Sequence, residues 1–66
     1  MKIQQYDIFR LQDDGTPVWL EPATTLDDAQ NRVHQFGVSD PGEYLIFNQN
    51  NAEKIPMRVS AEQGSD

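Results

Sequence analysis

Two of the four strand-like segments in this sequence adjoin or contain a proline, and this constrains how the segments can pack. Pro17 precedes the apolar segment 18–21, and Pro56 lies inside the segment 54–59. Because proline has no backbone N–H to donate to a neighbouring strand, it is confined largely to the edges of a sheet. We therefore expect these two segments to form the edge strands, with the other two strands between them.

Composition and alternation predict the strands. Residues 3–11 mix β-branched and aromatic side chains, and residues 43–48 form a nearly continuous apolar run. In residues 54–59, apolar side chains alternate with charged side chains or proline. The DDG sequence at 13–15 is typical of a hairpin turn. The DPG sequence at 40–42 suits a type II turn, with proline and then glycine at its two central positions.

A single helix is predicted over residues 26–36. Thr25 is a good N-cap, and Asp28 completes a pair that resembles a capping box. Gly37 follows where many helices end in a left-handed residue, which would let Val38 fold back onto the helix. The apolar stripe of this helix consists of Leu26, Ala29, Val33 and Phe36.

The predicted order of elements is ββαββ, a hairpin, a helix and a second hairpin. With the proline-bearing strands at the edges, the spatial order is 2-1-3-4 and all neighbouring strands are antiparallel. The alternative order 1-2-3-4 would make strands 2 and 3 parallel and would place Pro17 on a central strand. We therefore predict an α+β fold with one helix on one face of a four-stranded sheet. The domain spans residues 1–59, and residues 60–66 are predicted to be a disordered acidic tail.

Composition argues against several classes of function. The 66 residues allow one domain, and their 11 acidic and 5 basic side chains give a formal charge of −6. Because phosphate contacts dominate nucleic-acid affinity, this acidic chain with scattered cations is predicted to bind neither nucleic acid nor an anionic membrane. There is no apolar run of signal-peptide or membrane-spanning length. Together with the absence of cysteine, these features predict a cytoplasmic protein.

We find no pattern of residues typical of catalysis. The only histidine, His34, is predicted on the solvent side of the helix. The acidic pairs at 13–14 and 27–28 are explained by a turn and a helix cap, and they do not face each other across a cleft. A single histidine without cysteine cannot build a zinc site, and the glycines do not form a phosphate-binding loop. The sequence therefore predicts a protein that is not an enzyme and has no metal and no cofactor.

Trp19, the only tryptophan, is the main candidate for molecular recognition. Because successive strand residues point to opposite faces, we expect Trp19 and Glu21 on one face and Val18 and Leu20 on the other. If the helix covers Val18 and Leu20, Trp19 lies on the open face. If the helix covers Trp19, the residue belongs to the core, as the burial habits of tryptophan favour.

The neighbour of Trp19 across the first hairpin depends on the length of the turn. A three-residue loop sets Phe9 opposite Trp19 and Ile8 opposite Leu20. A two-residue loop instead sets Arg10 opposite Trp19, where a cation–π contact can form. Both loops are common, and the sequence is compatible with either.

The third strand offers apolar side chains to both faces of the sheet, whereas one helix covers only one face. The second face is therefore expected to expose hydrophobic surface, which marks an interaction site. We predict a small protein that acts through protein–protein contacts, as a homodimer or with another protein. The alternative is an acidic ligand-binding or regulatory module that recognises a cationic ligand or a basic protein. The candidate interaction surface consists of Trp19, Phe9, Glu21 and Phe47.

The chain also resembles an uncharacterised group of short bacterial hairpin–helix–hairpin proteins. The matching sequences are YDIFRLQDDGTPVWLE at 6–21, LDDA at 26–29 and PGEYLIF at 41–47, within a likeness that covers residues 5–59. The resemblance implies a ββαββ fold without an assigned activity, and it supplies no catalytic residues. The loop NQNNAE at 48–53 lacks the glycine that such proteins often place in their second hairpin turn.

Overall fold

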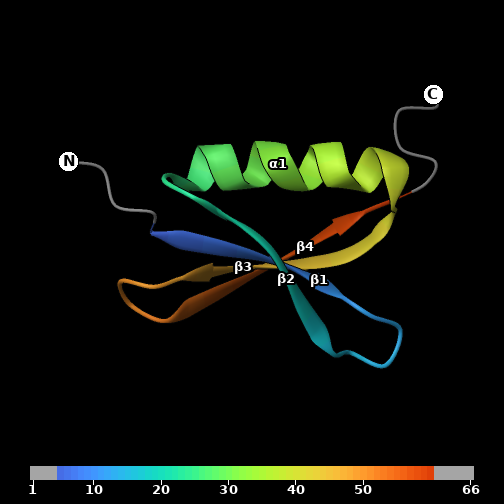
Figure 1. Cartoon of the computed structure of the whole chain (residues 1–66), viewed down its shortest axis with the longest axis horizontal. Helices are drawn as coiled ribbons and strands as arrows, with labels where there is room; N and C mark the ends of the chain where they lie inside the picture. Colours follow the sequence, from blue (N-terminus) through green and yellow to red (C-terminus); the bar gives the residue numbers. More distant parts are fainter. Residues whose placement is uncertain (1–4, 61–66) are drawn as a thin grey trace.

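The computed structural model describes residues 5–60, which form a ββαββ arrangement (Figure 1). Its elements are β1 (Tyr6–Leu11), β2 (Pro17–Ala23), α1 (Leu26–Ser39), β3 (Gly42–Asn48) and β4 (Glu53–Val59). Within this part of the chain the strands form one antiparallel sheet in the order β2-β1-β3-β4. The predicted fold class and strand order are confirmed, and the proline-bearing strands are the edges. The start of the first predicted strand and the predicted tail beyond Ser60 lie outside the described residues.

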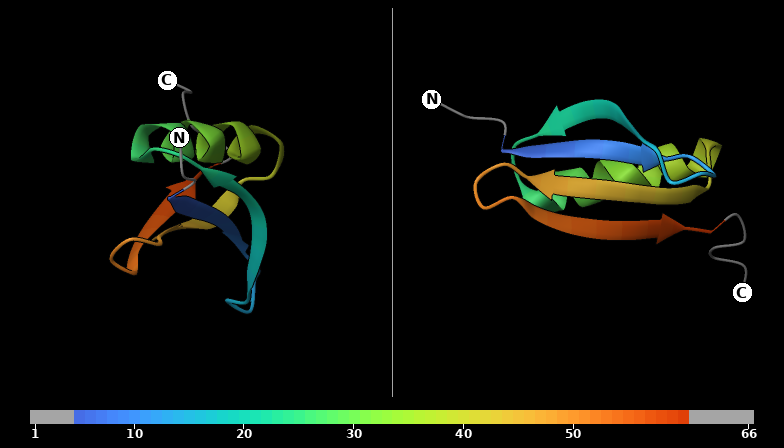
Figure 2. Two further views of the ribbon diagram at one scale, coloured as in Figure 1. Left: turned by 60° about the vertical axis from the view of Figure 1, so that its left-hand side comes forward. Right: turned by 90° about the horizontal axis from the view of Figure 1, so that it is seen from below.

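The core lies between α1 and one face of the sheet, and the other face is left open (Figure 2). Alternate residues of the central strands point toward α1, and they are the most deeply buried side chains. The helix contributes small or β-branched side chains, which let it lie close to the sheet. The buried apolar residues are Ile8, Ala23, Ala29, Val33, Tyr44, Ile46 and Val59.

The helix begins as predicted. The Thr25 hydroxyl accepts a hydrogen bond of 3.1 Å from the backbone N–H of Asp28, which satisfies one of the free donors of the first turn. The Asp28 carboxylate does not return to the cap. It accepts a hydrogen bond of 3.1 Å from Arg32 Nε, one turn further along α1.

The predicted end of the helix at Gly37 is wrong, because α1 continues to Ser39. Gly37 is buried and has helical geometry, and a Cβ atom on it would lie 2.3 Å from Cγ1 of Val59. Glycine is therefore needed here for the close approach of α1 to β4, and it does not cap the helix. Val38, which was expected to fold back onto the helix, is 78% exposed. Gly42 has a positive φ of 152° and is already the first residue of β3.

The first hairpin has the three-residue loop. The Gln12 N–H donates to the Thr16 carbonyl at 2.9 Å, which closes the loop over residues 13–15. Phe9 consequently pairs with Trp19. The alternative register, with Arg10 opposite Trp19, is excluded because Arg10 pairs with Val18.

Beyond this point the predicted pairing is wrong, because β2 contains a β-bulge. The register shifts between Ile8 and Phe9, so Ile8 pairs with Glu21 and Leu20 is the extra residue. Because the bulge interrupts the alternation, Leu20 and Glu21 both reach the helix side, where Leu20 packs against the core. Glu21 forms an ion pair with Arg32 of α1. The expectation that Glu21 shares a face with Trp19 is therefore wrong.

The second hairpin turns without glycine. Asn48 pairs with Glu53, and the Ala52 N–H donates to the Asn48 carbonyl at 2.7 Å. Ala52 takes the left-handed conformation, with φ of 62°. The Asn48 side chain accepts a hydrogen bond from the Asn50 N–H at 2.9 Å, which stabilises the turn. The turns of both hairpins project away from α1 (Figures 1 and 2).

Candidate interaction surface

The open face carries an apolar row that crosses all four strands of the described sheet. The strand registers pair Phe9 with Trp19 on one side and with Leu45 on the other, and Leu45 in turn pairs with Pro56. Directly paired side chains on one face lie within contact distance of each other. The row is therefore a continuous apolar band across the sheet, on the face opposite α1.

A shallow hollow of about 360 Å³ lies along this band. Apolar side chains from β1, β2 and β3 line most of it, and Asp7 and Lys54 complete the lining. We call Phe9, Pro17, Trp19, Leu45 and Phe47 the open-face patch.

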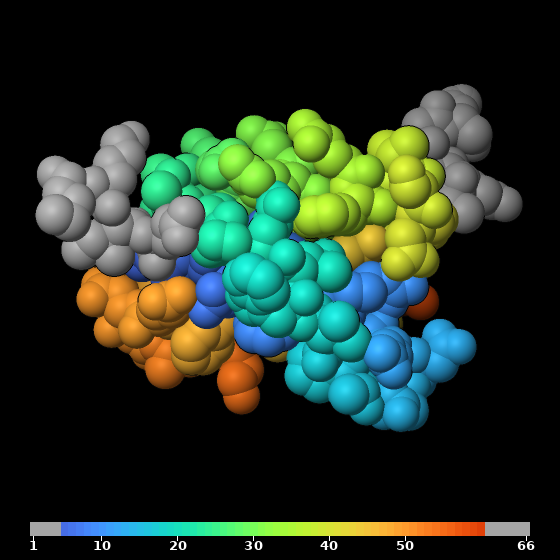
Figure 3. All heavy atoms as spheres, in the orientation of Figure 1, coloured from blue at the N-terminus to red at the C-terminus, as the bar shows by residue number. Residues whose placement is uncertain are grey.

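Trp19 is the most prominent member of the open-face patch. Its side chain is 54% exposed, and Figure 3 shows β2 at the surface in front of the sheet. The indole N–H donates to Asp7 Oδ1 at 3.2 Å, and the other oxygen of Asp7 accepts a hydrogen bond of 2.8 Å from Gln49. These contacts orient the indole and leave much of its ring uncovered. Trp19 is thus not part of the core, and α1 covers Leu20 on the other side.

The charges of the open face balance, although the whole chain has a charge of −6. Within residues 5–60, Asp7 and Glu43 point to this face from the central strands. Lys54 and Arg58 point to it from β4, where Arg58 is the cross-strand partner of Glu43. Other acids lie in the turn of the first hairpin and at the two ends of α1, where Arg32 and Arg10 offset part of their charge. These acids are Asp13, Asp14, Asp27, Asp28 and Asp40.

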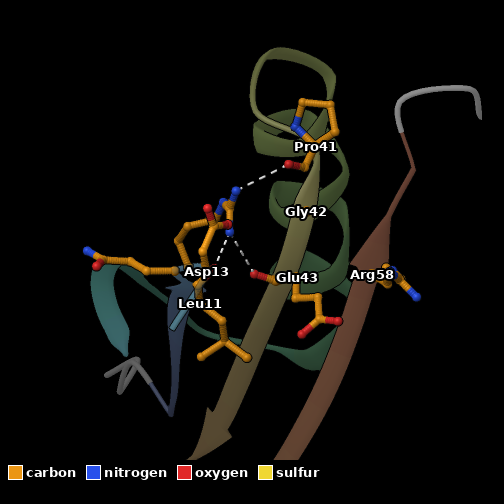
Figure 4. A pocket seen from close by; sticks show the side chains of 8 residues that line it. Leu11, Asp13, Pro41, Gly42, Glu43 and Arg58 are labelled. Atoms are coloured by element: carbon orange, nitrogen blue, oxygen red, sulfur yellow. Dashed lines mark hydrogen bonds between the residues drawn. The ribbon is translucent and has the colours of Figure 1, made fainter. Parts of the chain in front are cut away.

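A second, more polar hollow of about 290 Å³ lies between the end of β1 and the start of β3 (Figure 4). Arg10 lies beside it and donates to both carboxylate oxygens of Asp40, at 3.0 and 3.3 Å. The same guanidinium donates to the carbonyls of Leu11, Pro41 and Glu43, and the last two bonds are drawn in Figure 4.

These contacts occupy the five N–H donors of Arg10. The hydrogen bond to Asp40 raises the pKa of Arg10 above its ordinary value. The guanidinium carbon also lies 5.3 Å from the centroid of the Tyr44 ring, a cation–π contact. Arg10 therefore fastens the end of α1 to the sheet, and it has no donor left for a ligand in the hollow.

The sequence-predicted site residues divide into two groups. Phe9, Trp19 and Phe47 are brought together on the open face, whereas the bulge moves Glu21 to the helix side. Leu45 and Pro17 complete the open-face patch. Strand alternation already placed Leu45 on the same face as Phe47, so this signal was available in the sequence.

His34 is exposed on α1. In the part of the chain that the structure describes, no three His, Asp or Glu side chains are grouped so that they could hold a metal ion. The same residues include no helix that is long and apolar enough to cross a bilayer.

Comparisons with models of known families, with curated proteins and with solved structures found no match to this chain. The resemblance to short bacterial hairpin–helix–hairpin proteins remains a prediction.

Proposed function

We propose that this protein is a non-enzymatic interaction module that binds protein through the open-face patch. The observation that carries the proposal is the half-exposed Trp19 beside Phe9, in an apolar band that crosses the sheet. Because the chain lacks cysteine and so suits a reducing compartment, we place this interaction in the cytoplasm.

Leaving the open-face patch in water carries a free-energy cost that a partner can remove. Burying apolar area is worth about 25 cal/mol per Å², and the open-face patch contributes three aromatic rings that a partner can cover. Tryptophan is also enriched among the residues that dominate binding energy at interfaces. A partner that covers Trp19 and Phe47 therefore gains more here than on the polar outer side of α1.

The test compares two lysine substitutions, Trp19→Lys in the patch and Val38→Lys on α1. Val38 is the matched control because it is also apolar and is 78% exposed, yet it lies outside the open face. Fluorescently labelled chain is added to an extract of the source cells, and its sedimentation is compared with that of the purified chain. We expect a faster-sedimenting species with the wild type and with Val38→Lys, and at least a tenfold loss of that species with Trp19→Lys.

Circular dichroism and urea unfolding establish that both variants are folded before they are compared. Equal loss of the complex in both variants would contradict the proposal. A wild-type chain that forms no complex in the extract and no homodimer when purified would contradict it as well. Phe47→Lys provides a second patch variant in case Trp19→Lys destabilises the hairpin.

The alternative function is recognition of a cationic ligand or a basic protein by the acidic surface. Asp27 and Asp28 in the first turn of α1 and Asp40 at its end favour it, because α1 lies on the face of the sheet opposite the open-face patch. Binding of this kind weakens sharply as salt screens the charges. Binding through the open-face patch should weaken by no more than about tenfold between 0.1 and 1 M salt, where the Debye length falls to about 3 Å, because apolar burial supplies most of its free energy.

A further inference from the structure

We propose that the occupant of the open-face patch is a second copy of this chain, which forms a symmetric dimer through the sheet faces. This inference rests on the proposed function and names its partner. Three features favour a second copy: the balanced charge of the open face, the prolines on the edge strands, and the shape of the sheet.

Charge complementarity favours a second copy. A chain with a charge of −6 as a whole repels a second copy of itself. The open face is different, because Lys54 and Arg58 on β4 offset Asp7 and Glu43 on the central strands. In a symmetric dimer each copy presents this same surface to the other. The bases of one copy can then approach the acids of its mate.

The edges of the sheet are poorly suited to pairing with another strand. β2 contains Pro17 and Pro22, and β4 contains Pro56. Each proline removes one N–H from the row of donors that an added strand would need. Association through strand addition is therefore disfavoured on both edges, which leaves the face.

The shape of the face is compatible with packing against a second copy. The sheet is twisted (Figure 1), and its open side is uncovered over its whole width (Figure 2). Two sheets with the same hand of twist stack face to face at about 30°, as in β-sandwiches. A strand rises about 3.3 Å per residue, and neighbouring strands lie about 4.8 Å apart. Four such strands therefore give each face a projected area of roughly 400 Å². Two such faces bury roughly 800 Å² in total, which is below the range of about 1,200–2,000 Å² for stable specific interfaces. We therefore expect a weak dimer, with a dissociation constant on the order of 10 µM.

The test measures the molar mass of the purified chain by sedimentation equilibrium over a concentration range that spans 1 µM to 1 mM. Two variants each lower the charge by two units. Lys54→Gln/Arg58→Gln removes both bases of the open face, and Asn31→Asp/Gln35→Glu adds two acids to exposed positions of α1. We expect the first pair to weaken the dimer about tenfold and the second to change it less than twofold. Phe47→Lys, which keeps Trp19 as a reporter, should abolish the dimer below 1 mM.

The outcomes separate this inference from the proposed function. A wild-type chain that stays monomeric to 1 mM, or a dimer that survives Phe47→Lys, overturns the inference. Equal weakening by the two charge pairs also overturns it, because the effect would then reflect overall repulsion. If the purified chain is monomeric but still forms a Trp19-dependent complex in extract, the proposed function stands with a different partner. If both experiments give only monomer, both proposals fail.

Discussion

At the scale of single residues, Gly37 shows how a missing side chain sets the distance between α1 and β4. It lies within the helix, where glycine is normally unfavourable by about 1 kcal/mol relative to alanine. The side chain of Val59 occupies the space where a Cβ atom would project. The loss of helix propensity at this position is thus offset by the close packing of α1 against β4.

We expect Gly37→Ala to lower the free energy of unfolding by about 1–3 kcal/mol, the usual cost of overpacking a core. The gain in helix propensity works in the opposite direction, so the measured loss is a net value. Urea unfolding followed by circular dichroism measures it. Gln35→Ala, at an exposed position of the same helix, serves as the control and should change stability by less than about 0.5 kcal/mol. A Gly37→Ala protein as stable as the wild type would mean that α1 lies further from β4.

At the scale of elements, Tyr44 connects the end of α1 with β3. Its hydroxyl donates to the Asp40 carbonyl at 2.6 Å. Its ring stacks on Phe36, with the two centroids 6.4 Å apart. Burial raises the pKa of Tyr44 above its ordinary value of 10.0, because the charged phenolate would be desolvated. The neutral phenol is therefore the form that the folded protein favours.

This direction sets the pH dependence of stability. Below pH 10 both the folded and the unfolded chain hold the Tyr44 proton, so its contribution to stability is fully present. Above pH 10 the unfolded chain loses the proton first, and the free energy of unfolding falls. In a Tyr6→Phe background, absorbance titration should show Tyr44 ionising only above pH 10, together with loss of the folded circular dichroism signal. Ionisation at or below pH 10 with the fold intact would contradict the described environment of Tyr44.

The elements also show what the sequence could predict and where local patterns were insufficient. The prolines correctly predicted the edge strands, and Thr25 correctly predicted the start of the helix. The end of the helix was missed because a glycine needed for contact with Val59 looks the same in sequence as a capping glycine. The bulge at Leu20 was missed because no glycine or other local signal marks it. The bulge lets Leu20 and Glu21 both face α1, and these contacts are made between elements that are distant in sequence.

At the scale of the whole molecule, α1 covers one face of the sheet and leaves an apolar band on the other (Figure 2). Strand alternation predicted that Trp19 and Leu20 face opposite sides. It could not determine which of them the helix covers, because that depends on how the two hairpins pack. Of the four residues in the candidate surface, Phe9, Trp19 and Phe47 lie on the open face, and the bulge places Glu21 on the helix side. The charge balance of the open face could not be predicted from the sequence, because it depends on the strand registers.

The central claim is that Trp19 is displayed on the open face of the monomer and becomes covered on association. Because the chain has a single tryptophan, emission and acrylamide quenching report this residue alone. At concentrations where the molar mass is that of a monomer, we expect long-wavelength emission and efficient quenching. As the mass doubles, the emission should shift to shorter wavelength and quenching should decrease over the same concentration range. Short-wavelength, weakly quenched emission from the monomer would contradict the account, because Trp19 would then lie in the core.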